Sequence, residues 1–384
     1  MEQTQTANEV YYLKQIIELK NDIIKLQKEL LEKDKIMKQD KERIEELEKK
    51  LNEIKAKQGL MHPRLITTSG SFNILEKEPI FKIPHSSYSI YILQDGRLAA
   101  TCGNEIRIYN SETFKSEMTI KEHNDSSVYY ITQLSNGLLI SVDNKGYINI
   151  HSLLEDSKYL LLQKIHAHSE GIYKLREYDN DRFMTCSADS SSIKFYFKNK
   201  NEYFLDYTFQ DGQRDEKNSQ YYCIYNMLKT KEDEIAYMHY QSDCRNGYYY
   251  YYLKFYDLKQ RKIIDSSSIS AFRTSVNDSL YMVKKKYLLV GVENNILLFD
   301  INQRRKIRSI KSDNSGYILT FMQINDNTIL SGDANGKIRQ WIIDEDNLIH
   351  ENKKENADNS EIQMIRKRSD GLVISVSNSI KGWA

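Results

Sequence analysis

Histidines and acids at short spacing are the residues of this sequence that could carry chemistry. His166 and His168 stand two residues apart, so in a strand both would lie on one face and could ligate a metal. Asp143, Asp189 and Asp333 lie in short hairpins, and two such carboxylates brought together could act as general acid and base. The alternative is that these residues only hold hairpins in shape. We expect this structural role.

Signatures of the common enzyme classes do not occur in the sequence. It contains no Gly-x-Ser-x-Gly elbow, no glycine-rich phosphate loop and no His-Glu-x-x-His zinc motif. The four cysteines are widely spaced and form no Cys-x-x-Cys pair, which is typical of reduced thiols in a cytosolic protein. We therefore expect no catalytic residue, no cofactor and no bound metal.

Composition narrows the class further. Apolar residues make up 40% and charged residues 28% of the 384 positions, and the net charge is +1, which argues against both disorder and bulk attraction to nucleic acid. No apolar run approaches the roughly 18 residues needed to span a bilayer, and no apolar signal-peptide segment opens the chain. We expect a cytoplasmic protein with no membrane and no nucleic-acid partner.

The first 60 residues predict a coiled-coil helix, because apolar side chains recur every seven residues and neither Gly nor Pro occurs between Val10 and Gln58. The predicted seam is Ile16, Ile23, Leu30, Met37, Ile44 and Leu51. Ile and Leu at these positions favour a parallel homodimer through residues 10–58. A solvated single helix and association with a different protein are alternatives. Lys33 and Asp40 interrupt the second apolar row and would set its register.

From about residue 64 the hydrophobic period changes from 3.5 to 2, which predicts short strands. The strongest hairpin signal lies at residues 329–341, where an Asn-Gly turn joins two alternating runs and the second run contains Trp341. Weaker copies bring the number of units to seven, at roughly the 40–50-residue spacing of propeller blades. The fourth unit keeps the pattern least.

These units resemble the Trp-Asp repeat (WD-repeat) family of β-propellers. A histidine precedes three units (His85, His123, His168), a Ser or Thr recurs in the second strand (Thr101, Ser141, Thr185, Ser331, Ser375), and an aromatic closes most third strands (Tyr109, Tyr196, Tyr256, Phe299, Trp341, Trp383). In the third unit His168, Thr185, Asp189 and Tyr196 match the family's buried hydrogen-bond relay. The resemblance assigns the same structural role to Ser331, Trp341 and Trp383, and implies a non-enzymatic protein with protein partners.

We expect an all-β, seven-bladed propeller preceded by a long helical coiled coil. The predicted segments are a coiled coil at 1–60, a linker at 61–77 and a propeller at 78–384. The seventh unit ends after its third strand, so residues 78–83 are predicted to supply its outer strand and close the ring.

Two surfaces are candidates for partner binding. The first is the run Tyr248, Tyr249, Tyr250, Tyr251 and Tyr252, whose side chains would either face solvent as interface anchors or pack between blades. The second is a basic patch on the lower turns, represented by Lys284, Lys285, Lys286, Arg304 and Arg305. It would steer an acidic protein partner, unless these side chains are merely solvated.

The combined layout predicts an adaptor or scaffold that is oligomerised by its coiled coil and binds proteins through propeller loops. A cytoskeletal or ciliary protein that associates with microtubules is the alternative. A substrate receptor of a ubiquitin ligase is a more distant one.

Overall fold

The computed structural model describes residues 78–154, 158–187, 191–212, 220–243, 248–272, 279–311, 316–344, 347–354 and 357–383. The predicted coiled coil at 1–60 and the linker at 61–77 lie outside these described residues, as does Asp189, so they stay predictions. No helix within the described ranges is long and apolar enough to cross a membrane.

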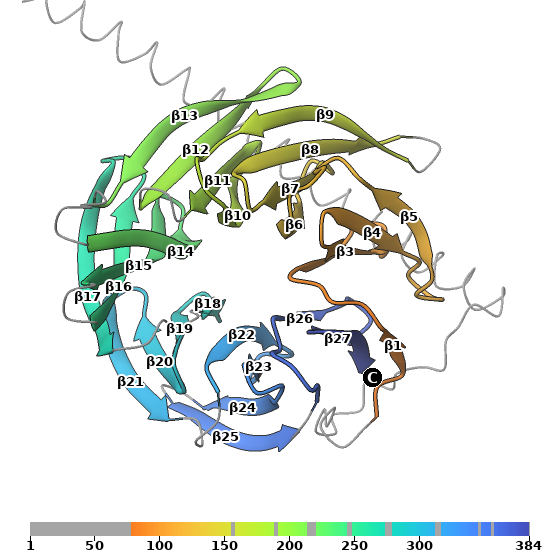
Figure 1. The fold of residues 1–384 in the computed structure, drawn as a ribbon. Helices are drawn as coiled ribbons and strands as arrows, with labels where there is room; N and C mark the ends of the chain where they lie inside the picture. The colour runs from red at the N-terminus through yellow and green to blue at the C-terminus, as the bar shows by residue number, and fades with distance from the viewer. Residues whose placement is uncertain are drawn as a thin grey trace, which may run out of the picture. The chain divides into compact units, whose positions relative to one another are not determined.

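The described strands form seven four-stranded antiparallel sheets arranged as the blades of a β-propeller (Figure 1). Blade 1 consists of β2 (Ile90–Ile92), β3 (Leu98–Cys102), β4 (Glu105–Tyr109) and β5 (Ser116–Ile120). Blade 2 consists of β6 (Val128–Gln133), β7 (Leu139–Asp143), β8 (Tyr147–Leu153) and β9 (Tyr159–His166). Blade 3 consists of β10 (Ile172–Asp179), β11 (Arg182–Ser187), β12 (Ser192–Asn199) and β13 (Glu202–Gln210).

The later blades repeat this order. Blade 4 consists of β14 (Gln220–Lys231), β15 (Glu234–Asp243), β16 (Tyr248–Asp257) and β17 (Lys262–Phe272). Blade 5 consists of β18 (Ser279–Val283), β19 (Tyr287–Val292), β20 (Asn295–Asp300) and β21 (Arg305–Lys311). Blade 6 consists of β22 (Ile318–Gln323), β23 (Thr328–Asp333), β24 (Ile338–Asp344) and β25 (Asn347–Lys354). Blade 7 consists of β26 (Met364–Lys367), β27 (Val373–Val376), β28 (Ile380–Trp383) and β1 (Phe81–Ile83).

Each blade runs from the centre of the ring to its perimeter. The first strands, such as β6, β10, β14 and β22, lie nearest the centre, and the fourth strands, such as β9 and β21, lie outermost (Figure 1). The middle strands are covered on both faces by neighbouring blades, so every residue of β7 and of β19 is buried. The outer strand β9 alternates between exposed and partly buried residues because one face meets water. The predicted all-β, seven-bladed propeller is confirmed.

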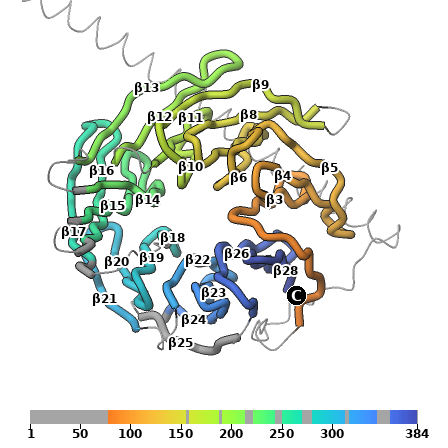
Figure 2. Tube along the Cα trace, viewed as in Figure 1, coloured from red at the N-terminus to blue at the C-terminus, as the bar shows by residue number. Residues whose placement is uncertain are grey.

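The ring closes where the two ends of the propeller meet. Strand β1 pairs antiparallel with β28, with Phe81 opposite Gly382, as the sequence predicted (Figure 2). The Phe81 ring stacks on Phe114 of the turn between β4 and β5, with ring centroids 3.7 Å apart. A methyl group at Gly382 would overlap the Phe81 ring, so glycine at this position is what lets the aromatic side chain lie across the seam. The pairing covers the edge that β28 would otherwise expose.

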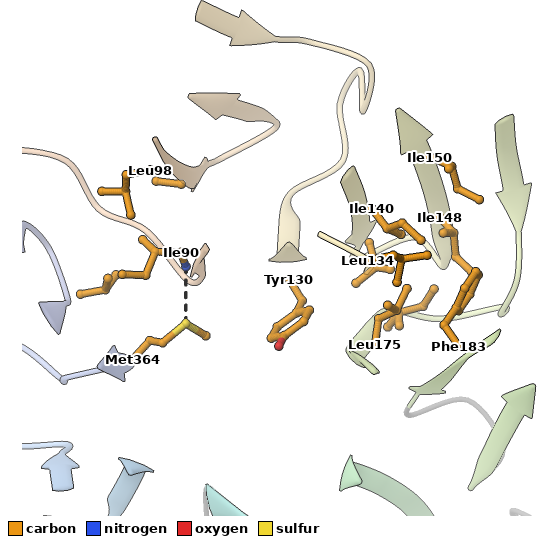
Figure 3. Packing of buried hydrophobic residues seen from close by; sticks show 14 of the residues in the cluster. Ile90, Leu98, Tyr130, Leu134, Ile140, Ile148, Ile150, Leu175, Phe183 and Met364 are labelled. Carbon is orange, nitrogen blue, oxygen red and sulfur yellow. Dashed lines mark hydrogen bonds between the residues drawn. The ribbon is translucent and has the colours of Figure 1, made fainter. Parts of the chain in front are cut away.

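The core lies between adjacent blades. Leu134 and Ile140 of blade 2 pack with Leu175 and Phe183 of blade 3 in one apolar cluster (Figure 3). The same cluster continues through blade 1 into blade 7, and Met364 Sδ accepts a hydrogen bond from the Ile90 amide at 3.5 Å. Burial of this size is the main favourable term in folding, and it is available only when each blade has a neighbour on both sides.

Blade 4, whose sequence pattern is the weakest, is a complete blade with long strands. Strands β14 to β17 contain 12, 10, 10 and 11 residues. Its interior is filled by aromatic side chains, with Tyr251 and Tyr256 each 1% exposed and Phe255 fully buried. The pattern is weak because tyrosines occupy positions that smaller or different side chains hold in the other units.

Replacing Phe81 with Ala should test the seam. The variant loses the stack on Phe114 and the contact with Gly382. Because Phe81 is only partly buried, we expect the variant's free energy of unfolding in urea to fall by about 2–3 kcal/mol, less than the loss typical of a fully buried phenylalanine. Lys82→Ala, at an exposed position of the same strand, is the matched control and should change stability by less than about 0.5 kcal/mol. Equal midpoints for the two variants would show that β1 does not close the ring.

Candidate binding site at the mouth of the central channel

Four of the first strands carry a β-bulge at the same place. The ladder between first and second strands skips Tyr129, Tyr173, Tyr225 and Leu319, each of which follows a fully buried residue. A bulged residue leaves the strand's alternation and its side chain is re-aimed. Tyr129, Tyr173 and Leu319 lie near the end of their strands where the chain enters from the previous blade. Tyr225 lies in the middle of the longer β14, and its side chain also packs against the apolar cluster of blades 4 and 5.

The bulged residues line a cavity of about 360 Å³. The lining residues come from six of the seven blades and are Tyr88, Tyr129, Tyr173, Lys174, Tyr225, Leu319 and Gln363. Because the contributing strands surround the axis of the ring, the cavity is the mouth of the central channel. Its volume falls in the range of ordinary ligand sites.

The tyrosines of the mouth form a continuous arc. Tyr88 meets Tyr129 edge-on at 5.6 Å, the rings of Tyr129 and Tyr173 are parallel at 6.5 Å, and Tyr173 lies 5.1 Å from Tyr225. The arc ends on Tyr240 of β15, 5.6 Å from Tyr225. Tyr88 is 54% exposed and the next three are partly buried, so the arc offers aromatic surface whose geometry is held by ring-to-ring contact.

Burial keeps the hydroxyls of Tyr173 and Tyr225 protonated at physiological pH. Burial, with smaller contributions from Cys223 and Tyr129, raises the pKa of Tyr173 to about 12. Burial likewise raises the pKa of Tyr225. The Tyr173 hydroxyl can therefore donate a hydrogen bond to a ligand, and neither Tyr173 nor Tyr225 can serve as a base at neutral pH.

Blade 2 contains a buried Ser-His-Asp array. Asp143 Oδ2 lies 2.9 Å from His123 Nδ1, and Ser141 Oγ lies 2.7 Å from His123 Nε2. Burial opposes ionisation of Asp143, but hydrogen bonds from His123 and from the Tyr147 and Lys145 amides outweigh it and lower the pKa of this carboxyl. The same geometry activates serine nucleophiles. Here the three side chains are at most 2% exposed, so the array braces the β7–β8 hairpin and has no path to a substrate.

Blade 3 joins two of the residues predicted to form a structural relay and places a third, Tyr196, against Phe183. His168 Nε2 lies 2.9 Å from Thr185 Oγ1, and both side chains are buried. Tyr196, 2% exposed, stacks on Phe183 at 4.9 Å. The fourth predicted member, Asp189, lies outside the described residues.

Blades 6 and 7 connect their second and third strands through tryptophan. Trp341 Nε1 donates to Ser331 Oγ at 2.8 Å, and Trp383 Nε1 donates to Ser375 Oγ at 2.9 Å. All four side chains are at most 2% exposed. Each bond satisfies a buried indole and a buried hydroxyl at once, which is why this pairing fixes the blade.

His166 and His168 do not converge on a common site. His166 is exposed and stacks on Tyr147 at 4.6 Å, whereas His168 is buried in its bond to Thr185. Among the described residues, no group of three or more His, Cys, Asp or Glu side chains is placed to hold a metal ion.

The predicted basic patch is partly tied up in structural contacts. Its members lie in the β18–β19 and β20–β21 turns and at the start of β21, and are Lys284, Lys285, Lys286, Arg304 and Arg305. Arg304 donates to the Glu234 carboxylate of blade 4 from Nε at 2.9 Å and from Nη2 at 2.6 Å, and the glutamate side chain is only 6% exposed. Lys284 Nζ donates to Asn327 Oδ1 of blade 6 at 2.8 Å. Arg304 and Lys284 therefore connect blade 5 to its two neighbours.

The tyrosines in the run of β16 differ in burial, and one of them belongs to the core. Tyr251 is 1% exposed, lies 5.3 Å from Tyr240 and packs with Leu280 of blade 5, so it belongs to the core between blades. Tyr250 and Tyr252 are partly buried. The side chains of Tyr248 and Tyr249 fall outside the described part of the chain, and a role at an interface stays a prediction for the run.

Two features of the interior were not predicted from the sequence. The first is the tyrosine arc, whose signal is a tyrosine directly after a buried aliphatic residue of the first strand in units two to four, as in Val128-Tyr129. The second is Arg339, which is fully buried and forms an ion pair with Asp333, itself fully buried. No sequence signal marks Arg339, because it occupies an ordinary position in an alternating strand.

Comparison with known proteins supports the fold alone. No family model matches this chain, and no curated protein matches its sequence. Among solved structures, a chain in the crystal structure of the Mitotic Checkpoint Complex is similar, with a TM-score of 0.62. The match covers 84% of this chain and 95% of that chain at 10% sequence identity. At this identity the likeness shows a shared propeller architecture.

Buried His151 gives the propeller a specific pH dependence. It occupies the third-strand position of blade 2 that Trp341 holds in blade 6, is fully buried, and has its pKa lowered from 6.5 to about 4, by burial and then by the charge of His123. The unfolded chain therefore binds a proton first as pH falls. The stability that neutral His151 provides is complete above about pH 6.5 and is lost toward pH 4, at about 1.4 kcal/mol per pH unit.

Urea unfolding of the wild type and of His151→Phe between pH 7 and pH 4.5 measures this contribution. The wild-type curve should fall more steeply than the variant's, because phenylalanine cannot be protonated. His166→Phe, at an exposed position, should follow the wild-type curve. Parallel curves for the wild type and His151→Phe would contradict the assignment.

Proposed function

We propose that this chain is a non-enzymatic scaffold of the WD-repeat type that binds protein partners at the channel mouth. The observation that carries the proposal is the arc of Tyr88, Tyr129, Tyr173 and Tyr225, which places four aromatic side chains on one face of a closed ring. Tyrosine is among the residues that dominate binding energy at protein interfaces. Its ring gives a large contact area for little loss of side-chain freedom.

The support for the arc is rigid. Each of Tyr129, Tyr173 and Tyr225 sits next to a fully buried residue of an inner strand, so its backbone is held by the blade core. A rigid surface loses little conformational entropy on binding, which favours affinity for a partner. The similar chain of known structure comes from the Mitotic Checkpoint Complex, and use of this fold in a protein assembly is in line with the proposal.

The N-terminal heptads extend this proposal. A parallel dimer through residues 10–58 would carry two propellers, so that two weak contacts to one partner assembly reinforce each other through effective concentration. We place the protein in the cytoplasm on its composition and reduced cysteines.

Affinity purification of tagged full-length chain tests the mouth. Tyr129→Ala combined with Tyr173→Ala should lower recovery of specific partners by at least about tenfold, as expected for the loss of interface anchors. Lys115→Ala is the control, because this exposed residue lies in the β4–β5 turn, at the opposite end of the blades and outside both candidate surfaces. A melting temperature near the wild-type value must accompany the loss. Equal recovery from both variants would place binding elsewhere.

Light scattering after size exclusion tests self-association. The wild type should run at the mass of two 45.3 kDa chains, and Ile23→Asp with Leu30→Asp should reduce it to one, because a charge at each seam position must be buried. Asn21→Asp with Lys28→Gln makes the same change in net charge outside the seam and should stay dimeric. A monomeric wild type would refute the coiled-coil dimer.

A further inference from the structure

Below the tyrosine mouth, the inner strand of every blade carries a partly buried residue at the same position. Pairing with the second strand puts these seven residues in equivalent register: Tyr91, Thr132, Arg176, Leu228, Tyr281, Met322 and Arg366. All seven are partly buried, whereas the residues that precede them in sequence are almost all fully buried in the blade cores. We call this set the channel ring. Arg176 and Arg366 are its two charged members.

The two arginines act on each other across the channel. Arg176 belongs to blade 3 and Arg366 to blade 7, which are not adjacent. Burial, then the charge of Arg366, lowers the pKa of Arg176 to about 10, and burial lowers the pKa of Arg366. Tyr91 and Tyr281, from blades 1 and 5, also contribute to the pKa shifts of these guanidinium groups. Side chains of such separate blades come together only around the axis.

Neither guanidinium has an acidic partner among the described residues. Arg176 Nη1 donates to Tyr130 Oη and lies over the Tyr130 ring, and Arg366 Nη1 donates to the Ile365 carbonyl at 2.9 Å. A guanidinium has five donors, so most donors of both groups are left for another acceptor. The Glu170 carboxylate, which contributes to the raised pKa of Tyr173, is exposed and lies at the rim of the mouth.

Two like charges held in a half-buried channel are costly unless something compensates them. Lys174, which lines the mouth cavity, brings a third cation next to Arg176, with its Nζ 5.2 Å from the centre of the Tyr130 ring. Cations in a concave, low-dielectric setting concentrate an anion far more strongly than the same cations on an open surface.

We propose that Arg176 and Arg366, with Lys174 at the entrance, form a site for the anionic side chain of an acidic peptide segment that enters through the tyrosine mouth. This inference rests on the proposed function, since it names the chemistry of the partner that the mouth receives. The anionic group is a carboxylate or a phosphate. Both accept paired hydrogen bonds from a guanidinium, while the tyrosine arc contacts the flanking peptide backbone and apolar atoms.

Fluorescence anisotropy on the full-length chain tests the site. Three labelled peptides share the same flanking sequence and differ only at their centre, which contains three glutamates, one phosphoserine or three glutamines. We expect the glutamate or phosphoserine peptide to bind saturably and the glutamine peptide to bind at least about tenfold more weakly, a difference of about 1.4 kcal/mol. Inorganic pyrophosphate is added as a competitor, to measure whether a small free anion binds the same site. Binding of pyrophosphate without binding of either acidic peptide would overturn the peptide assignment.

Arg176→Met and Arg366→Met remove one cation each while keeping an unbranched apolar stem. Each should weaken acidic-peptide binding by at least about tenfold. Met322→Leu, in the same channel ring, and Lys115→Met, in the exposed β4–β5 turn, should bind like the wild type. Wild-type affinity in both arginine variants would overturn the proposal.

Thermal melting separates a ligand site from a structural role. If the arginines hold the ring together, their loss lowers the melting temperature without ligand. If they form the site, the melting temperature stays level or rises when one like charge is removed, and the increase that the acidic peptide gives the wild type disappears. Absence of that increase in the wild type would also overturn the proposal.

The two proposals fail in different ways. Partner recovery that depends on Tyr129 and Tyr173 but is unchanged in Arg176→Met and Arg366→Met leaves the scaffold standing and removes the anion site. Recovery that is independent of the tyrosines removes the scaffold proposal, and with it the reason for a peptide to enter the channel.

Discussion

The pairing of β1 with β28 is the constraint on which the rest of the structure depends. A blade buries both of its faces against neighbours, so an open ring would leave the apolar faces of blades 1 and 7 in water, including Ile90 and Met364. Closure joins segments from the two ends of the propeller and is locked by Phe81 lying across Gly382. The channel is a product of the same closure, because Arg176 and Arg366 act on each other only once the ring is complete.

Different blades stabilise the same region with different chemistry. Blade 2 uses a Ser-His-Asp array, blade 6 a Trp–Ser bond with a buried Asp–Arg pair, and blade 7 a Trp–Ser bond. Each solution gives the buried serine of the second strand, Ser141, Ser331 or Ser375, a hydrogen-bond partner, which is the physical requirement. The requirement can be met by several residue sets, so the repeats diverged in sequence while the blades kept one geometry.

Much of the fold follows from local sequence physics, whereas the channel does not. The turn at Asn335-Gly336, the period-2 runs and the missing strand of the last unit together predict seven blades and the closure by Phe81, all of which the structure contains. The arc of Tyr129 and Tyr173 depends on bulges, and a bulge is defined by the pairing of the first strand with the second, which the first strand's own residues do not specify. The encounter of Arg176 with Arg366 depends on the curvature of the whole ring, which no local pattern encodes.

The bulges also separate two demands on the inner strands. A residue inside a ladder packs against its cross-strand neighbours, so changing it disturbs the core. A bulged residue such as Tyr129 or Leu319 is skipped by the ladder and touches chiefly the channel mouth. The mouth can thus be rewritten by single substitutions that leave the blades intact. Selection for a new partner and selection for foldability can then proceed almost independently in this ring, as the exchange of tyrosine for leucine and glutamine between its own blades already illustrates.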